Sequence, residues 1–142
     1  MTETVLITDK GFSADAFGGA EFVSLADLQA NPDMPGQGLA IDMPNDRDPA
    51  ELAPYFSRAA LIRVAFPGMG DGRGFSIARR LRAMGYAGRL RAKGPLIADQ
   101  ARAARRVGFD EIEVPEALAK RQPEELWLAR PALSYRDRVF AD

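Results

Sequence analysis

The sequence contains no cysteine and no histidine among its 142 residues. Without cysteine, the chain cannot form disulfides, hold iron–sulfur clusters through thiolates or use a cysteine nucleophile. Without histidine, it lacks the commonest acid–base group of neutral pH and the usual zinc ligands. The acidic residues show no clustered spacing that suggests a carboxylate Mg²⁺ site. We therefore expect no metal and no cofactor, and redox chemistry would need a bound cofactor for which the flavin and nicotinamide signatures are poor.

Long apolar runs and an excess of basic charge are also missing. No stretch approaches the ~18 consecutive apolar residues of a membrane span, and the N-terminus carries Glu3 but no basic region of the kind found in secretory signals. We therefore expect a cytoplasmic protein with no membrane contact. The net charge of -1 provides no broad positive field for nucleic-acid binding. The length predicts a single domain over residues 1–142 with one hydrophobic core.

Glycine, by contrast, is concentrated in one stretch, FPGMGDGRGFS at residues 66–76. Before it, residues 59–66 read AALIRVAF, a short apolar run that is typical of a buried strand. After it, apolar residues recur at helical spacing up to Met84, and Gly85 ends the pattern. A strand, a glycine-rich turn and a helix start in succession favour an anion-binding site.

The glycine spacing does not identify the anion. The stretch lacks the Gly-Lys-Ser/Thr ending of a P-loop and the final two-residue gap of a dinucleotide-binding fingerprint. A structural alternative is a loop that an Asp71–Arg73 contact stiffens and in which the glycines serve only to turn the chain. Both interpretations stay open at the level of the sequence.

The remainder of the chain alternates short strands with helices. We expect strands near residues 4–8 and 21–25 that form a hairpin or flap around Gly18-Gly19. Helices are expected to begin where N-cap residues or prolines precede apolar periodicity, at Ser24, Asp48, the glycine-rich stretch, Asp99, Pro115 and Gln122. Further strands are expected at residues 39–43, 59–66, 89–93 and 109–114.

From residue 59 onward the order is therefore β-α-β-α-β-α with short connections, which predicts an α/β fold with a mainly parallel sheet. An open sheet is our first interpretation, and a β/α half-barrel is the alternative because the second unit is compact. In a parallel sheet the loops that follow the strands share the carboxyl edge, where ligands bind. We expect convergence at that edge of Asp71, Arg73, Ser76, Lys93 and Asp99.

Basic residues alternate with apolar ones in one of these predicted strands. Arg89, Arg91 and Lys93 point to one face of it, and the residues between them point to the other. A strand that lies between helices should be apolar on both faces. This strand is therefore either an edge strand with a solvated face or the wall of a polar site. Arg79, one helical turn after Ser76, is placed to reach back toward the glycine-rich loop.

Residues 60–114 resemble the core of a bacterial family called domain of unknown function 934, with a weaker similarity at Leu133-Ser134-Tyr135. The family's motif residues occur in this sequence as Phe66, Pro67, Asp71, Gly72, Arg73, Gly74, Ser76, Ala78, Arg79, Leu81, Arg82, Gly85, Tyr86, Gly88, Leu90, Arg91, Ala92, Gly94, Asp99, Gln100, Arg106, Gly108, Phe109 and Asp110.

The resemblance implies a role in sulfur assimilation, because members are typically encoded beside assimilatory sulfite reductase and phosphoadenylylsulfate reductase and are often labelled oxidoreductases. This chain departs from the family pattern at three places. Met69-Gly70 stands where an aromatic residue usually precedes the aspartate, Arg89 stands where glutamate is usual, and Pro95 stands where an acidic residue is frequent. The glycine and arginine skeleton of the motif is intact.

Two hypotheses follow. The first is a non-catalytic accessory protein of sulfite reduction that contacts sulfite reductase or its electron donor, since no set of nucleophile, base and orienting group is apparent. The second is a small enzyme or binding protein for a sulfur oxyanion or phosphosulfate nucleotide. A homo-oligomer is left open. The expected anion-site residues are Asp71, Gly72, Arg73, Gly74, Ser76, Arg79, Arg91, Lys93, Asp99 and Gln100.

Overall fold

The computed structural model describes residues 4–8, 11–13, 22–33, 38–68 and 72–128. Within these residues, seven strands form one sheet in the order β2-β1-β7-β6-β5-β4-β3. The strands are β1 (Thr4–Thr8), β2 (Gly11–Ser13), β3 (Phe22–Ser24), β4 (Leu39–Met43), β5 (Ala59–Ala65), β6 (Arg89–Lys93) and β7 (Glu111–Pro115). The helices are α1 (Leu25–Ala30), the 3₁₀ helix η1 (Pro49–Arg58), α2 (Arg73–Ala83), α3 (Ala98–Arg106), α4 (Glu116–Ala119) and α5 (Glu124–Leu128).

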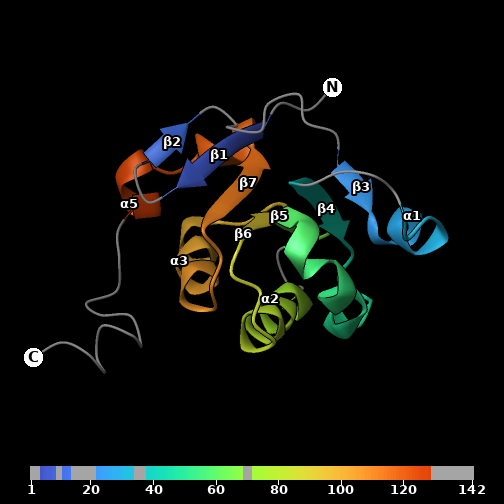
Figure 1. The fold of residues 1–142 in the computed structure, drawn as a ribbon. Coiled ribbons are helices and arrows are strands. Elements are labelled where there is room, and N and C mark those ends of the chain that lie inside the picture. The colour runs from blue at the N-terminus through green and yellow to red at the C-terminus, as the bar shows by residue number, and fades with distance from the viewer. Residues whose placement is uncertain (1–3, 9–10, 14–21, 34–37, 69–71, 129–142) are drawn as a thin grey trace, which may run out of the picture.

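Strands β3 to β7 are all parallel, and each of β4 to β7 lies beside the strand that precedes it in the sequence. Because right-handed crossovers that always advance in one direction keep their helices on one side, η1, α2 and α3 cover the same face of the sheet (Figure 1). The predicted α/β class and parallel βα units are confirmed. A β/α barrel is built in the same way, with every crossover advancing in one direction. Here, however, the sheet stays open between its end strands β2 and β3.

The N-terminal hairpin is confirmed, but its second strand was predicted in the wrong place. Strand β1 pairs antiparallel with β2 on one side and with β7 on the other. The segment expected to complete the hairpin, residues 21–25, instead contains β3, which lies at the opposite end of the sheet and runs parallel to β4. Gly11, with a φ of 114°, supplies the left-handed backbone at the start of β2. Gly18-Gly19 lies outside the described residues.

Most helix starts follow the expected capping. Ser24 accepts a hydrogen bond from the Asp27 amide at 3.0 Å, and Asp48 forms a capping box with Glu51. Asp99, however, is not an N-cap, because α3 begins at Ala98. The side chain of Gln100 takes over the capping role and accepts a hydrogen bond from the Ile97 amide at 3.1 Å. Among the described helices, none is long and apolar enough to cross a membrane.

The core lies between the sheet and its helical layer. Alternate strand residues point into it and are fully buried, among them Ile41, Ile62, Leu90 and Ile112. At the carboxyl edge Phe66 packs edge-on against Phe75 and Phe109, with ring centroids 5.0 and 5.8 Å apart. These contacts fix the place where β5 leaves the sheet and α2 begins.

Candidate functional site

The face of the sheet opposite the helices carries charged residues on its central strands. The register places Asp42, Arg63, Arg91 and Glu111 side by side across β4, β5, β6 and β7. Residues two positions on in a strand share the same face, which adds Lys93 and Glu113 to this group. We call Asp42, Arg63, Arg89, Arg91, Lys93, Glu111 and Glu113 the ionic cluster.

Arg63 connects the two ends of the ionic cluster. Its Nε and Nη2 donate to the two carboxylate oxygens of Asp42 at 2.6 and 2.9 Å, and its Nη1 donates to Glu113 Oε1 at 3.1 Å. The Phe22 ring stacks on the guanidinium, with its centroid 3.5 Å from Cζ. Burial alone would lower the pKa of Arg63, but the hydrogen bonds and charges of Asp42 and Glu113 outweigh it and raise the pKa. Arg63 is therefore a permanent cation.

Arg91 is the most buried charged residue of the described chain, with a side chain that is 0% exposed. Its Nε donates to Glu111 Oε2 at 2.7 Å and its Nη1 donates to Glu113 Oε1 at 2.9 Å. Arg89 also pairs with Glu111. Since β6 is the fourth of seven strands, the interpretation of Arg89, Arg91 and Lys93 as the solvated face of an edge strand is wrong.

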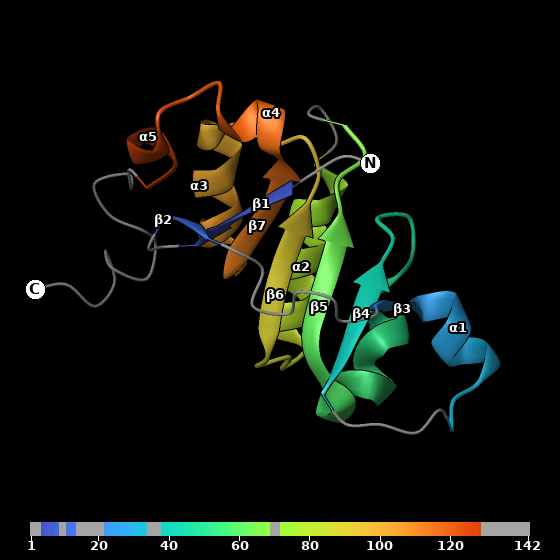
Figure 2. The same cartoon turned by 90° about the horizontal axis from the view of Figure 1, so that it is seen from above.

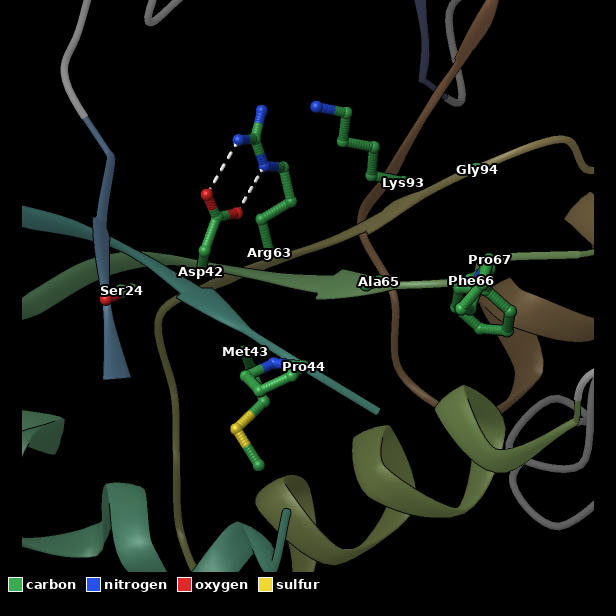
Figure 3. Close-up of a pocket in the computed structure, with 10 residues that line it drawn as sticks. All are labelled: Ser24, Asp42, Met43, Pro44, Arg63, Ala65, Phe66, Pro67, Lys93 and Gly94. Carbon is green, nitrogen blue, oxygen red and sulfur yellow. Dashed lines mark hydrogen bonds and ion pairs between the residues drawn. The ribbon is translucent and has the colours of Figure 1, made fainter. Parts of the chain in front are cut away.

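A pocket of about 530 Å³ lies at the carboxyl edge, beside the ionic cluster (Figure 3). Lys93 stands at this pocket with 46% of its side chain exposed, and its Nζ lies 3.8 Å from Glu113 Oε2. We call this the edge pocket. It is lined by Ser24, Asp42, Met43, Pro44, Arg63, Ala65, Phe66, Pro67, Lys93 and Gly94.

A second hollow, of about 340 Å³, lies at the start of α2. Gly72 is the N-cap of α2 and supplies no side-chain cap to the first turn. Arg80 pairs with Asp48 at 3.2 Å across the hollow, whereas Arg47 pairs with Glu51. We call this the α2 hollow. It is lined by Asn45, Arg47, Asp48, Pro49, Arg73, Ser76, Ile77 and Arg80.

The residues expected to form one anion site are divided among these places. Arg73 and Ser76 meet in the α2 hollow, and Lys93 lines the edge pocket. Arg79 is exposed on α2 but does not line the hollow. Asp71 lies outside the described residues.

Three further predicted residues have structural contacts. Asp99 pairs with Arg102 in the first turn of α3, and Gln100 caps the same helix. Gly74 packs under Phe66, because a Cβ at this position would lie 2.4 Å from Phe66 Cζ. Close packing of β5 against α2 is therefore sufficient reason for a glycine there.

Sequence reasoning missed four of the seven residues of the ionic cluster, namely Asp42, Arg63, Glu111 and Glu113. A signal was present: Arg63 interrupts an otherwise apolar strand, and Glu111 and Glu113 alternate with apolar residues as Arg89 and Arg91 do. Polar residues at the same parity in neighbouring parallel strands indicate one shared polar face. Among the described residues, no three acidic side chains gather as a metal site would require.

Comparison with known proteins now gives the family. Searches of curated proteins and of solved structures find no match. The sequence profile described as "Bacterial protein of unknown function (DUF934)" matches residues 40–139, which is more than half of the chain. This range includes the glycine-rich stretch, strands β5 to β7 and all of β4 except Leu39. The chain therefore belongs to the bacterial DUF934 family.

Proposed function

We propose that this chain is an accessory protein of assimilatory sulfate or sulfite reduction that acts through contact with sulfite reductase or its electron donor. Family membership supports the pathway, because members typically lie beside genes for sulfite and phosphoadenylylsulfate reductases. The composition supports an accessory role. With no cysteine or histidine, the chain lacks the thiol used in side-chain redox chemistry and the acid–base group whose ordinary pKa lies nearest neutral pH.

The α2 hollow is the observation that carries the contact hypothesis. It brings three arginines, Arg47, Arg73 and Arg80, to one concave surface. Asp48 and Glu51 offset part of this charge. Guanidinium groups of this kind bind carboxylates with two parallel hydrogen bonds and are enriched at protein interfaces. The hollow therefore suits an acidic segment of a partner protein.

Growth of a deletion strain tests the pathway. A bacterium that lacks the gene should grow poorly with sulfate or sulfite as sole sulfur source and normally with cysteine. The wild-type gene should restore growth, as should an Arg121→Ala variant, since Arg121 is exposed and lies outside the α2 hollow. An Arg73→Ala variant should not restore it. Growth of the deletion strain that equals that of the parent on sulfate and on sulfite would refute the role.

The same hollow favours a second candidate function, the binding of a sulfur oxyanion or phosphosulfate nucleotide. The first turn of α2 has no side-chain cap, and two of its residues, Arg73 and Ser76, line the hollow, near the positive end of the helix dipole. Tetrahedral anions bind at such helix starts.

Calorimetric titration separates the two candidates. Sulfite, sulfate and adenylyl nucleotides are titrated into the purified chain, with Arg73→Ala as the test variant and Arg121→Ala as the control. Heat that Arg73→Ala abolishes and Arg121→Ala preserves would establish small-anion binding. An absence of heat at millimolar ligand would leave partner contact as the function of the hollow.

A further inference from the structure

The edge pocket lies on the face that no helix of the described chain covers. In Figure 3 the side chains of Asp42, Arg63 and Lys93 point away from the helical layer, whereas Met43 and Phe66 point toward it. Met43 and Phe66 are each only 1% exposed, so they add little surface to the pocket. The pocket is therefore a charged wall beside an apolar floor.

The floor is formed where β4 and β5 end. Ala65 lies two positions after Arg63 in β5, so the two side chains are on the same face of the sheet. Pro44 follows the last residue of β4, Pro67 lies two residues after the end of β5, and both add rings without an amide donor. The aliphatic stems of Arg63 and Lys93 extend this apolar surface. Such a floor suits the hydrocarbon part of a small molecule.

The charged side chains of the wall differ in how many hydrogen bonds they already make within the protein. Both carboxylate oxygens of Asp42 accept hydrogen bonds from Arg63, and the Glu113 carboxylate accepts hydrogen bonds from Arg63 and from Arg91. Within the described part of the chain, Lys93 has a single ionic contact, at 3.8 Å, which is too long for a hydrogen bond. Its ammonium group carries three donors. The Lys93 ammonium group therefore has donors left to bind a ligand.

We propose that the edge pocket binds a small organic anion, with its carboxylate or sulfonate beside Lys93 Nζ and its apolar body over Ala65 between Pro44 and Pro67. The volume of about 530 Å³ falls within the range of small-molecule sites, roughly 300 to 1,000 Å³. The place is the carboxyl edge of a parallel sheet, where α/β proteins bind ligands. A cationic ligand fits less well, since it would have to displace Arg63 from Asp42.

The edge pocket and the α2 hollow share no lining residue. The proposal is therefore independent of the proposed function, and Arg73→Ala should leave binding in the edge pocket unchanged. The two proposals can fail separately.

Nuclear magnetic resonance titration of the full chain tests the edge pocket. The probes are benzoate, benzenesulfonate and hexanoate, each beside its neutral amide or sulfonamide, with inorganic sulfate as a probe of charge alone. At least one acid should shift the amide signals of Ser24, Ala65 and Gly94 and should bind about tenfold more tightly than its neutral counterpart. Inorganic sulfate should not compete at the same concentration.

Two variants assign the binding to the pocket. Lys93→Met keeps the aliphatic stem and should weaken binding of the acid about tenfold, whereas Ala65→Leu should block it by filling the floor. Lys120→Met is the control, because Lys120 pairs with Glu116 on α4 and does not line the pocket. The proposal is overturned if no acid shifts the three amide signals, if acids and neutral counterparts bind equally, or if Lys93→Met and Lys120→Met bind alike.

Discussion

Gly94 is the residue on which the geometry of the carboxyl edge depends most directly. Its φ of 156° lies in the region that L side chains rarely adopt, and a Cβ there would lie 2.0 Å from the Phe66 carbonyl oxygen. The backbone cannot move away freely. The Gly94 amide donates to Glu113 O at 3.0 Å, and the neighbouring Lys93 carbonyl accepts from the Phe66 amide at 2.8 Å.

We expect Gly94→Ala to lower the free energy of unfolding by at least about 2 kcal/mol, because it combines backbone strain with a clash against main-chain atoms. Gly68→Ala is the matched control from the same edge. Nothing lies within 4 Å of its added Cβ, so the change should stay within about 0.5 kcal/mol. Urea unfolding followed by circular dichroism measures both. Equal midpoints for the two variants would show that the edge yields to the added methyl group.

At this scale the sequence predicted the directions of side chains but not their partners. Alternation placed Arg89, Arg91 and Lys93 on one face, which the structure confirms. The partners Glu111 and Glu113 lie on the next strand, and their pairing depends on the register of β6 against β7. A shift of one residue would turn every side chain of a strand to the other face. No local pattern in the sequence fixes that register.

Among the elements, η1 shows how a helix start can make stability depend on pH. The Glu51 carboxylate accepts hydrogen bonds from Arg47 Nε and from Gln29 Nε2 on α1, both at 3.0 Å, and from the Asp48 amide at 3.2 Å. These bonds, that to Arg47 foremost, lower the pKa of Glu51 from 4.5 to about 2. The carboxylate thus favours the folded state above pH 4.5, and this contribution is lost as the pH falls toward 2.

We expect Glu51→Gln to remove this contribution. The wild type should lose stability more steeply than the variant as the pH falls from 4.5 to about 2, because only the wild type must protonate a hydrogen-bonded carboxylate at this position. The measurement is the urea midpoint at several pH values across that window. Asp33→Asn, a change of an exposed carboxyl in the turn after α1, serves as the control and should follow the wild type. Parallel curves for wild type and Glu51→Gln would contradict the prediction.

The elements themselves were well predicted where capping residues are local in sequence. Ser24 and Asp48 both cap as expected. η1 is nevertheless a 3₁₀ helix with Pro54 inside it, since a proline within a helix removes a donor and crowds the preceding turn. The start of α3 was predicted in the wrong place because the Ala98 amide donates to a residue far along the sequence, the side chain of Gln122, at 2.9 Å. A contact between residues 98 and 122 has no signature within the window that predicts a helix.

For the molecule as a whole, alternation of strands and helices was enough to predict a parallel sheet but not its winding. Consecutive placement of β3 to β7 puts η1, α2 and α3 on one face (Figure 2). The opposite face is therefore free to carry charge, which a sheet with helices on both faces would not allow. The ionic cluster is a consequence of this topology. It spans four strands, from Asp42 on β4 to Glu113 on β7.

The cluster should consequently act on the sheet as a unit. Arg91→Met would leave Glu111 and Glu113 without their buried cation and should lower the free energy of unfolding by about 3 to 5 kcal/mol. Native-state hydrogen exchange should show the loss in β4 and β7 alike, because global unfolding would dominate exchange in both. Added salt should change the stability of the wild type little, since buried pairs are weakly screened.

A surface arginine and a double variant complete this test. Arg102→Met breaks the pair with Asp99, which is 78% exposed, and should cost less than about 1 kcal/mol. Combining Arg91→Met with Glu111→Gln removes one of the two carboxylates that lose Arg91, while Glu113 keeps Arg63 and Lys93. The combination should recover at least about 1 kcal/mol of the loss. If Arg91→Met costs no more than Arg102→Met, or if the second change recovers nothing, the charges on this face do not hold the sheet together, and its stability comes from the apolar side alone.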